Sequence, residues 1–284
     1  MLKLRSPLRD IPRTVSDLRC ISFVSLFIPL CFIFQLCIVL PEFHEPGSIM
    51  FILTWIGGVF VVFQIAGNFL ACMMVDTSIR AIILTPPQEP QLRKLWRFCS
   101  LCEILAPMRS WHCDSCRTCV LKRDHHCIFT GNCVGHRNQR YFILFIFYVI
   151  IGCSYCCLYN TVYFWYLHKD IYLNSRTVMS LICPFVGFFF DISWKNLYLL
   201  TYELSFISLL YALILFLFHW PNILKGSTTH ESLSSKYDLG REQNLELVFG
   251  KRWHLVWLSP LLESELPHDG VHWETLLKQS IKNR

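Results

Sequence analysis

Four long runs of apolar residues alternate with polar segments, and this pattern is the first guide to the fold. A helix needs about 20 apolar residues to cross the hydrocarbon core of a bilayer. Runs of that length lie at about 20–40, 49–75, 141–167 and 197–220. A fifth run, 177–190, is too short and contains a proline, so we expect an interfacial or re-entrant piece there. The pattern predicts an all-α polytopic membrane protein with four transmembrane helices.

The charge of the segments between these runs predicts their orientation. Loop 41–48 contains two glutamates and neither Lys nor Arg, whereas segment 76–140 is rich in both basic residues. Because cytosolic segments are enriched in Lys and Arg, we expect the N-terminus and segment 76–140 in the cytosol and loop 41–48 on the lumenal side. The first run is too long for a signal peptide and predicts an uncleaved anchor. The expected parts are a cytosolic tail (1–19), a first pair of spans (20–75) and a cytosolic module (76–140). A second pair of spans with a lumenal segment (141–220) and a second cytosolic tail (221–284) follow.

Composition agrees with a membrane protein. Hydrophobic residues make up 54% of the 284 and charged residues only 16%, well below the roughly 25% of a soluble domain. The formal net charge of +6 mostly reflects the basic cytosolic segments, so it does not require a nucleic-acid partner. We expect the lipid bilayer, and no nucleic acid, among the partners.

The cytosolic module contains seven closely spaced cysteines. They lie in C-S-L-C at 99–102, H-C-D-S-C-R-T-C at 112–119, D-H-H-C at 124–127 and N-C at 132–133. Paired cysteines at C-x-x-C spacing are typical of tetrahedral zinc, which takes four nitrogen or sulfur ligands. Two zinc ions need eight ligands, which six cysteines and two histidines supply, so one cysteine is left over. Cytosolic thiols stay reduced, so we expect metal sites here rather than disulfides.

The D-H-H-C segment has a property that the other cysteine groups lack. Alternate side chains of an extended chain point to opposite sides. If His126 faces a zinc, then His125 and Cys127 face the other way together, with Asp124 available to orient the imidazole of His125. A nearby imidazole promotes the nucleophilic thiolate, and an acid behind it fixes the tautomer of the ring. The segment therefore predicts a reactive thiol.

The pattern continues beyond the cysteines in both directions. It runs through Cys99-x2-Cys102, Pro107-x-Arg109, His112-Cys113-x2-Cys116-x2-Cys119, Asp124-His125-His126-Cys127, Asn132-Cys133-x-Gly135, Asn138 and Phe142. In order and spacing it resembles the DHHC cysteine-rich domain of the DHHC palmitoyltransferases. The same family has four spans with this module between the second and the third. Thr228-Thr229-His230-Glu231 also resembles its T-T-x-E motif, and the stretch around Asn244 resembles its C-terminal motif more loosely.

The resemblance implies roles for individual residues. Cys127 would accept the acyl group, His125 would be the general base, and Asp124 would orient it. The two zinc ions would be structural, because every coordination position is filled by protein. Their expected ligands are Cys99, Cys102, His112 and Cys119 for the first, and Cys113, Cys116, His126 and Cys133 for the second.

The resemblance also implies a reaction. A protein S-acyltransferase moves a long-chain acyl group, often palmitoyl, from acyl-CoA through a Cys127 thioester to membrane-proximal cysteines of substrate proteins. We expect this at the cytosolic face of the endoplasmic reticulum or the Golgi. Contacts to acyl-CoA are expected from Arg109, Arg123, Phe129 and Phe142. For the two arginines, an orientation or lipid-headgroup charge is the alternative.

Departures from the family pattern leave an alternative open. Ile128, Phe129, Thr130 and Gly131 stand where the family has Pro-Trp-Val-Asn. Phe129 lacks the indole N–H, and losing one such hydrogen bond slows a reaction by about tenfold. The alternative function is therefore a catalytically weak or inactive membrane zinc scaffold of the same family. A nucleic-acid-binding zinc finger is a third class, disfavoured because no base-reading helix is predicted.

Overall fold

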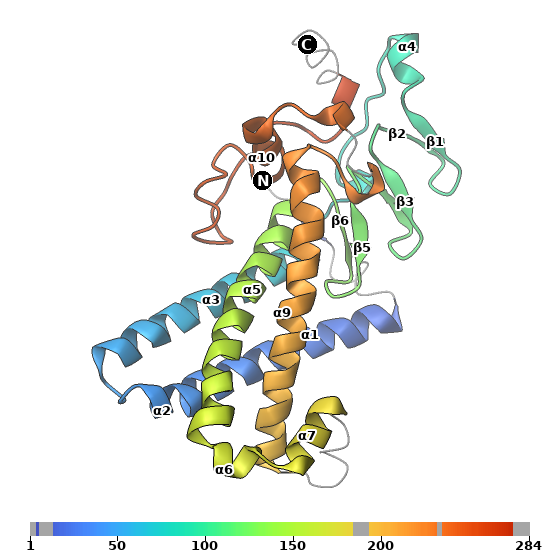
Figure 1. The fold of residues 1–284 in the computed structure, drawn as a ribbon. Helices are drawn as coiled ribbons and strands as arrows, with labels where there is room; N and C mark the ends of the chain where they lie inside the picture. Colours follow the sequence, from blue (N-terminus) through green and yellow to red (C-terminus); the bar gives the residue numbers. More distant parts are fainter. Residues whose placement is uncertain (1–3, 6–13, 184–192, 232–234, 275–284) are drawn as a thin grey trace. The chain divides into compact units, whose positions relative to one another are not determined.

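The structure is a computed structural model, and it describes residues 4–5, 14–183, 193–231 and 235–274 (Figure 1). The expected tails 1–19 and 221–284 and the short apolar run 177–190 therefore lie partly outside the described residues. The chain divides into two compact units. Unit 1 comprises Met1–Ser22, Ala66–Phe145 and Phe216–Arg284, and unit 2 comprises Phe23–Ile65 and Ile146–Leu215.

Four helical stretches among the described residues are long and apolar enough to cross a membrane, which confirms the four predicted spans. They are Val15–Phe43, Ile49–Met74, Gln139–Leu167 and Trp194–Leu224. The first begins earlier than the apolar run because Thr14 caps it, and the Thr14 Oγ1 accepts a hydrogen bond from the backbone N–H of Asp17 at 3.0 Å.

Two of these stretches are interrupted by π-helical turns. The first consists of α1 (Val15–Ile33), a π-helical turn (Phe34–Val39) and α2 (Leu40–Phe43). The second is α3 (Ile49–Met74) and the fourth is α9 (Trp194–Leu224). The third is α5 (Gln139–Val162) with a π-helical turn (Tyr163–Leu167). The short helices are α4 (Pro90–Arg93), α6 (Lys169–Tyr172), α7 (Ser175–Ile182) and α10 (Arg241–Phe249).

Unit 2 is helical, and aromatic rings fill its core. Phe34, Tyr163, Phe164 and Tyr172 are all buried in one cluster. Large apolar side chains of α3, such as Ile52 and Ile56, remain exposed on the outside of the protein. In water this exposure would be unfavourable, whereas hydrocarbon accepts it. The outer surface of the unit thus fits a lipid environment.

The cysteine module, between α3 and α5, contains three antiparallel hairpins within its described residues (Figure 1). They pair β1 (Arg97–Cys99) with β2 (Ile104–Ala106), β3 (Trp111–Cys113) with β4 (Thr118–Val120), and β5 (His125–Cys127) with β6 (Asn132–Val134). In each hairpin a cysteine is the last residue before the loop. The final loop residue has a left-handed backbone in every case, with φ of 53° at Glu103, 51° at Arg117 and 56° at Gly131.

This shared loop geometry makes Cys127 the counterpart of Cys99 and Cys113. The third loop residue is a second cysteine in the first two hairpins, but it is Thr130 in the third. A hairpin that resembles a zinc-binding loop therefore presents a single sulfur.

Side-chain amides tie the third hairpin to the C-terminal end of α3. The Asn132 Nδ2 donates to the carbonyl oxygens of Cys72 and Val75 at 3.0 and 3.1 Å. The Asn138 Nδ2 donates to the carbonyl oxygens of Cys72 and Cys133 at 3.1 and 3.0 Å. The carbonyls of a last helical turn have no partner within the helix, so these amides satisfy them and fix the hairpin at the end of α3.

The C-terminal segment also packs on the module. Val271 joins the apolar cluster that includes Trp96 and Leu121. The fully buried Trp273 packs with Met108 and Tyr237. The module thus gains an apolar core from a part of the chain that is remote in sequence.

Candidate active site and metal centres

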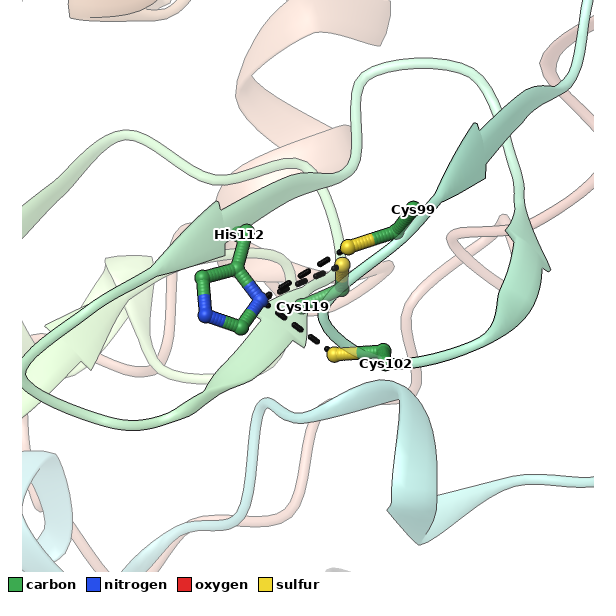
Figure 2. A group of neighbouring side chains, drawn as sticks. All are labelled: Cys99, Cys102, His112 and Cys119. Carbon is green, nitrogen blue, oxygen red and sulfur yellow. Dashed lines mark hydrogen bonds between the residues drawn. The ribbon is translucent and has the colours of Figure 1, made fainter.

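The first metal-ligand group lies where the first two hairpins meet (Figure 2). The Nδ1 atom of His112 lies 3.7, 3.2 and 4.0 Å from the sulfurs of Cys99, Cys102 and Cys119. All four donor atoms lie within 4.8 Å of one another. The structure thus brings together the four residues that the resemblance implied for the first zinc.

The second group has the same composition. The Nδ1 atom of His126 lies 3.7, 3.3 and 3.7 Å from the sulfurs of Cys113, Cys116 and Cys133. The sulfurs of Cys116 and Cys133 are 3.6 Å apart. The backbone N–H of Cys116 also donates a hydrogen bond of 3.4 Å to the sulfur of Cys113.

The spacing of both groups fits zinc. With Zn–S of about 2.3 Å and Zn–N of about 2.1 Å, a tetrahedron has S–N edges of about 3.6 Å and S–S edges of about 3.8 Å. The observed separations lie around these values. Three thiolates and one imidazole complete the coordination, so each group could hold a metal ion without an open position for a substrate.

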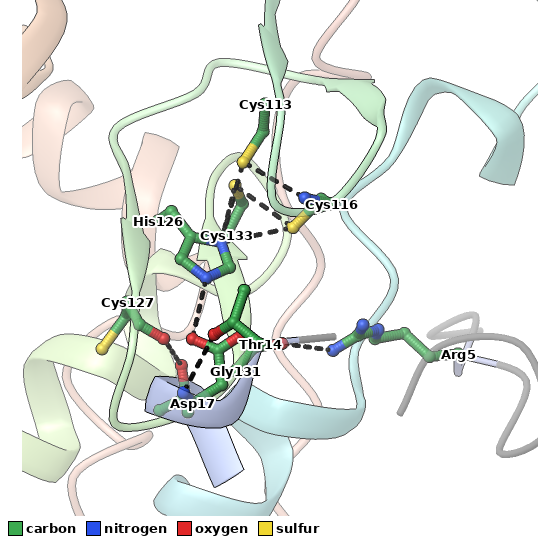
Figure 3. Close-up of polar contacts among 10 residues, drawn as sticks. Arg5, Thr14, Asp17, Cys113, Cys116, His126, Cys127, Gly131 and Cys133 are labelled. Carbon is green, nitrogen blue, oxygen red and sulfur yellow. Dashed lines mark hydrogen bonds and ion pairs between the residues drawn. The ribbon is translucent and has the colours of Figure 1, made fainter. Parts of the chain in front are cut away.

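Cys127 lies outside both groups. Figure 3 shows its sulfur on the opposite side of β5 from the His126 ring and the three sulfurs around it. In the hairpin register His126 faces Cys133, whereas His125 and Cys127 face Val134 and Asn132. This is the arrangement that the alternation of side chains along a strand produces.

Asp124 and His125 stand beside Cys127. The Nδ1 of His125 donates to Oδ2 of Asp124 at 2.7 Å, and the ring of His125 also lies within reach of a hydrogen bond with the Cys127 thiol. Asp124 is 4% exposed, and Thr229 donates to it from its backbone N–H at 2.8 Å and from its hydroxyl at 2.9 Å. The carboxylate is therefore held from a second part of the chain.

Electrostatics favours a charged pair at this site. Burial raises the pKa of Cys127, but the hydrogen bond and positive charge of His125 outweigh it and leave the pKa below its ordinary value. Burial lowers the pKa of His125, yet its contacts with Asp124 and Cys127 raise it overall to about 9. Burial likewise raises the pKa of Asp124, and its hydrogen bonds with His125 and His219 bring it well below its usual range. The contacts among the three residues therefore favour the charged forms, a thiolate, an imidazolium and a carboxylate.

His219 is a site residue that the sequence analysis missed. Its Nδ1 lies 3.3 Å from Oδ2 of Asp124, and its ring centroid lies 5.0 Å from that of His125. Phe142 completes the packing, with centroid distances of 4.8 Å to His125 and 5.1 Å to His219. The available signal was an ionisable residue near the end of an apolar run, which deserves a functional interpretation by default.

Arg109 is engaged within the protein. Its Nε and Nη2 donate to the two carboxylate oxygens of Glu231 at 2.7 and 2.6 Å, and Nη2 also donates to the carbonyl of Gly226 at 2.8 Å. Its guanidinium carbon lies 4.1 Å from the centroid of Tyr237 and 4.3 Å from that of Trp273. Glu231 of the predicted T-T-x-E motif is thus bound to the cysteine module.

The other residues expected to contact acyl-CoA also have protein neighbours. Arg123 is half-buried beside the sulfurs of Cys113 and Cys133. Phe142 is buried against the rings described above, and Phe129 is half-buried in the loop of the third hairpin. The contacts of Arg109, Arg123, Phe129 and Phe142 with acyl-CoA stay predictions.

Known proteins resemble this chain over most of its length. The family model for DHHC palmitoyltransferase matches residues 93–236. The probable palmitoyltransferase ZDHHC24 of Mus musculus is 32% identical over 236 residues, covering 75% of each chain. Palmitoyltransferase ZDHHC15 of Xenopus laevis is 36% identical over 181 residues, covering 59% of this chain and 47% of that protein. The probable protein S-acyltransferase 12 of Arabidopsis thaliana is 32% identical over 182 residues, covering 59% of this chain and 55% of that protein.

Proposed function

Because the chain belongs to the DHHC palmitoyltransferase family and is thus a protein S-palmitoyltransferase, we propose that it works through a thioester on Cys127. A long-chain acyl group passes from acyl-CoA to this sulfur and then to cysteines of substrate proteins. The reaction takes place at the cytosolic face of a membrane of the endoplasmic reticulum or the Golgi. The observation that carries the proposal is the position of Cys127, outside both ligand groups and beside a histidine bound to an aspartate.

In the first half-reaction the Cys127 thiolate attacks the carbonyl carbon of the acyl-CoA thioester. The bond between that carbon and the coenzyme sulfur breaks, and the coenzyme leaves as a thiol after taking the proton held by His125. Asp124 keeps the His125 ring oriented throughout and stabilises it whenever it is protonated.

In the second half-reaction His125 accepts the proton of a substrate cysteine, whose sulfur attacks the acyl carbon. The bond to Cys127 breaks, and Cys127 returns as the thiolate beside the imidazolium of His125. The enzyme thus returns to its starting charge state, and the scheme is ping-pong.

The bound metal ions would supply rigidity rather than chemistry. Each strand of the hairpins is only three residues long, and the hairpins have little apolar core of their own, so metal ligation would hold the strand that carries Cys127. Asn132 anchors the same hairpin to the end of α3, a predicted span. This contact supports a position for the thioester at the boundary between lipid and water.

Labelled palmitoyl-CoA tests the proposal on the purified full-length chain. We expect a label that hydroxylamine removes, that Cys127→Ala abolishes, and that His125→Ala strongly reduces. Zinc content should stay at about two ions per chain in both variants, as eight ligands remain. Normal labelling of Cys127→Ala would contradict the acyl-enzyme. An unlabelled wild type with full zinc content would instead favour the scaffold alternative, which the intact arrangement of Asp124, His125 and Cys127 argues against.

A further inference from the structure

Asp17, in the first turn of α1, reaches a residue of the second ligand group. Its carboxylate Oδ1 lies 3.2 Å from Nε2 of His126, and its side chain is only 2% exposed (Figure 3). His126 directs its other ring nitrogen, Nδ1, at the three sulfurs. One imidazole thus joins a carboxylate of the N-terminal segment to the thiolates of the cysteine module.

A second contact from the N-terminal segment reaches the same hairpin. The Arg5 guanidinium donates to the carbonyl oxygen of Gly131, in the β5–β6 loop, at 3.1 Å. It also donates to the carbonyl of Met73 at 3.2 Å, and the backbone N–H of Arg5 donates to the carbonyl of Met74 at 2.7 Å. Asp17 and Arg5 therefore hold the third hairpin at its strand and at its loop.

We propose that Asp17 is a positioning residue that holds His126 in the orientation needed for metal binding. A histidine that binds metal through Nδ1 carries its proton on Nε2, and a carboxylate that accepts a hydrogen bond from this N–H fixes the tautomer and the ring plane. Because His126 lies between His125 and Cys127 on β5, the same contact fixes the strand that presents the reactive sulfur. This role goes beyond the ligand sets and the acyl-transfer residues.

The first ligand group provides an internal comparison. Nε2 of His112 has a carboxylate oxygen of Asp114 at 3.8 Å, beyond hydrogen-bond distance, and the Asp114 side chain is 98% exposed. The side chain of Asp17, by contrast, is almost fully enclosed. An acid in the first turn of a helix also stabilises that helix, but this effect needs neither burial nor a contact with His126.

Zinc release from the purified full-length chain tests the proposal without measuring acyl transfer. We would compare Asp17→Ala, Asp17→Asn and the matched control Asp114→Ala, and follow transfer of zinc to a metallochromic chelator. Loss of a carboxylate partner typically weakens metal binding by about 10–100-fold. We expect Asp17→Ala to release one of two zinc ions at least about tenfold faster than wild type, with the other unchanged. Asp114→Ala should release both ions at the wild-type rates.

The asparagine variant and cobalt substitution distinguish a specific contact from general loosening. The Asn amide oxygen still accepts a hydrogen bond from Nε2–H but lacks the charge that roughly doubles the strength of the bond, so zinc release from Asp17→Asn should be intermediate in rate. In cobalt-substituted protein, Asp17→Ala should shift the visible absorption of one site only. The proposal would be overturned if Asp17→Ala released zinc at the wild-type rate, or if it released both zinc ions faster to the same extent. If Asp17→Ala does not fold, selective acceleration in Asp17→Asn supports it and unchanged release rejects it.

Discussion

The Nδ1 atom of His219 lies 3.3 Å from Oδ2 of Asp124, the oxygen that also accepts a hydrogen bond from His125. The carboxylate therefore faces two imidazoles, one from the third hairpin and one from the end of α9. This contact links the fourth predicted span to the candidate active site.

Replacing His219 by phenylalanine should slow acylation without unfolding the protein. The variant keeps a ring against Phe142 but loses the N–H directed at Asp124. A hydrogen bond to a charged group contributes about 1.5–3 kcal/mol, so we expect the single-turnover rate of Cys127 acylation to fall by about tenfold or more. His230→Phe is the control, because His230 is exposed and stacks on Trp111 instead. Equal rates for His219→Phe and wild type would contradict a role for His219.

The reactivity of Cys127 should depend on pH in a direction set by His125. An ordinary cysteine thiol has a pKa of about 8.5. Because the pKa of Cys127 is lowered, its thiolate forms at a lower pH than that of an ordinary thiol. The imidazolium beside it is lost as the pH rises through about 9. We expect the alkylation rate of Cys127 by iodoacetamide, followed by peptide mapping, to rise at a lower pH than that of an ordinary thiol. In His125→Ala burial remains without the compensating charge, so the rise should move upward in pH. Overlapping profiles would rule out the charged pair.

The Arg109–Glu231 pair should be important for stability. The Arg109 side chain is fully buried and that of Glu231 is 14% exposed. Removing one partner of a buried ion pair costs roughly 3–5 kcal/mol, because the other charge stays buried and unpaired. We expect Glu231→Ala to lower the thermal unfolding midpoint by several degrees or more. Glu265→Ala is the control, because its pair with Lys251 is exposed on both sides, and such exposed pairs contribute little to stability. Equal midpoints for the two variants would contradict the assignment.

Gly67 should be required for the packing of the C-terminal segment against α3. A Cβ atom at this position would overlap Cγ of Pro260, and the rigid proline ring cannot turn aside. Overpacking of this kind costs about 1–3 kcal/mol. We expect Gly67→Ala to speed tryptic cleavage at Lys251 and Arg252. Gly57→Ala, on the same helix, would meet nothing within 4 Å and should leave cleavage unchanged. Indistinguishable digests of the two variants would disprove the prediction.

The features that could be predicted from the sequence are local ones. The four spans follow from the length of each apolar run, and the structure confirms them. The alternation of side chains in 124–127 separates His126 from His125 and Cys127 without any knowledge of the rest of the fold. Arg109 shows where such reasoning stops, because its spacing indicates a family motif but not its pairing with Glu231, 122 residues away. Its predicted contact with acyl-CoA is still to be tested.

The sequence by itself determined the class of protein, the number of candidate zinc ligands and the surplus thiol, because hydropathy and ligand spacing are properties of neighbouring residues. The division of these ligands into two groups followed from the resemblance to the family. Only the tertiary structure decided what surrounds them. Asp17 meets His126 across 109 residues, and His219 meets Asp124 from a different span. No periodicity connects such pairs, because their approach depends on how separate helices and hairpins pack. The candidate ligands and the surplus thiol can therefore be named from the chain, whereas the residues that orient them are found only in the folded protein.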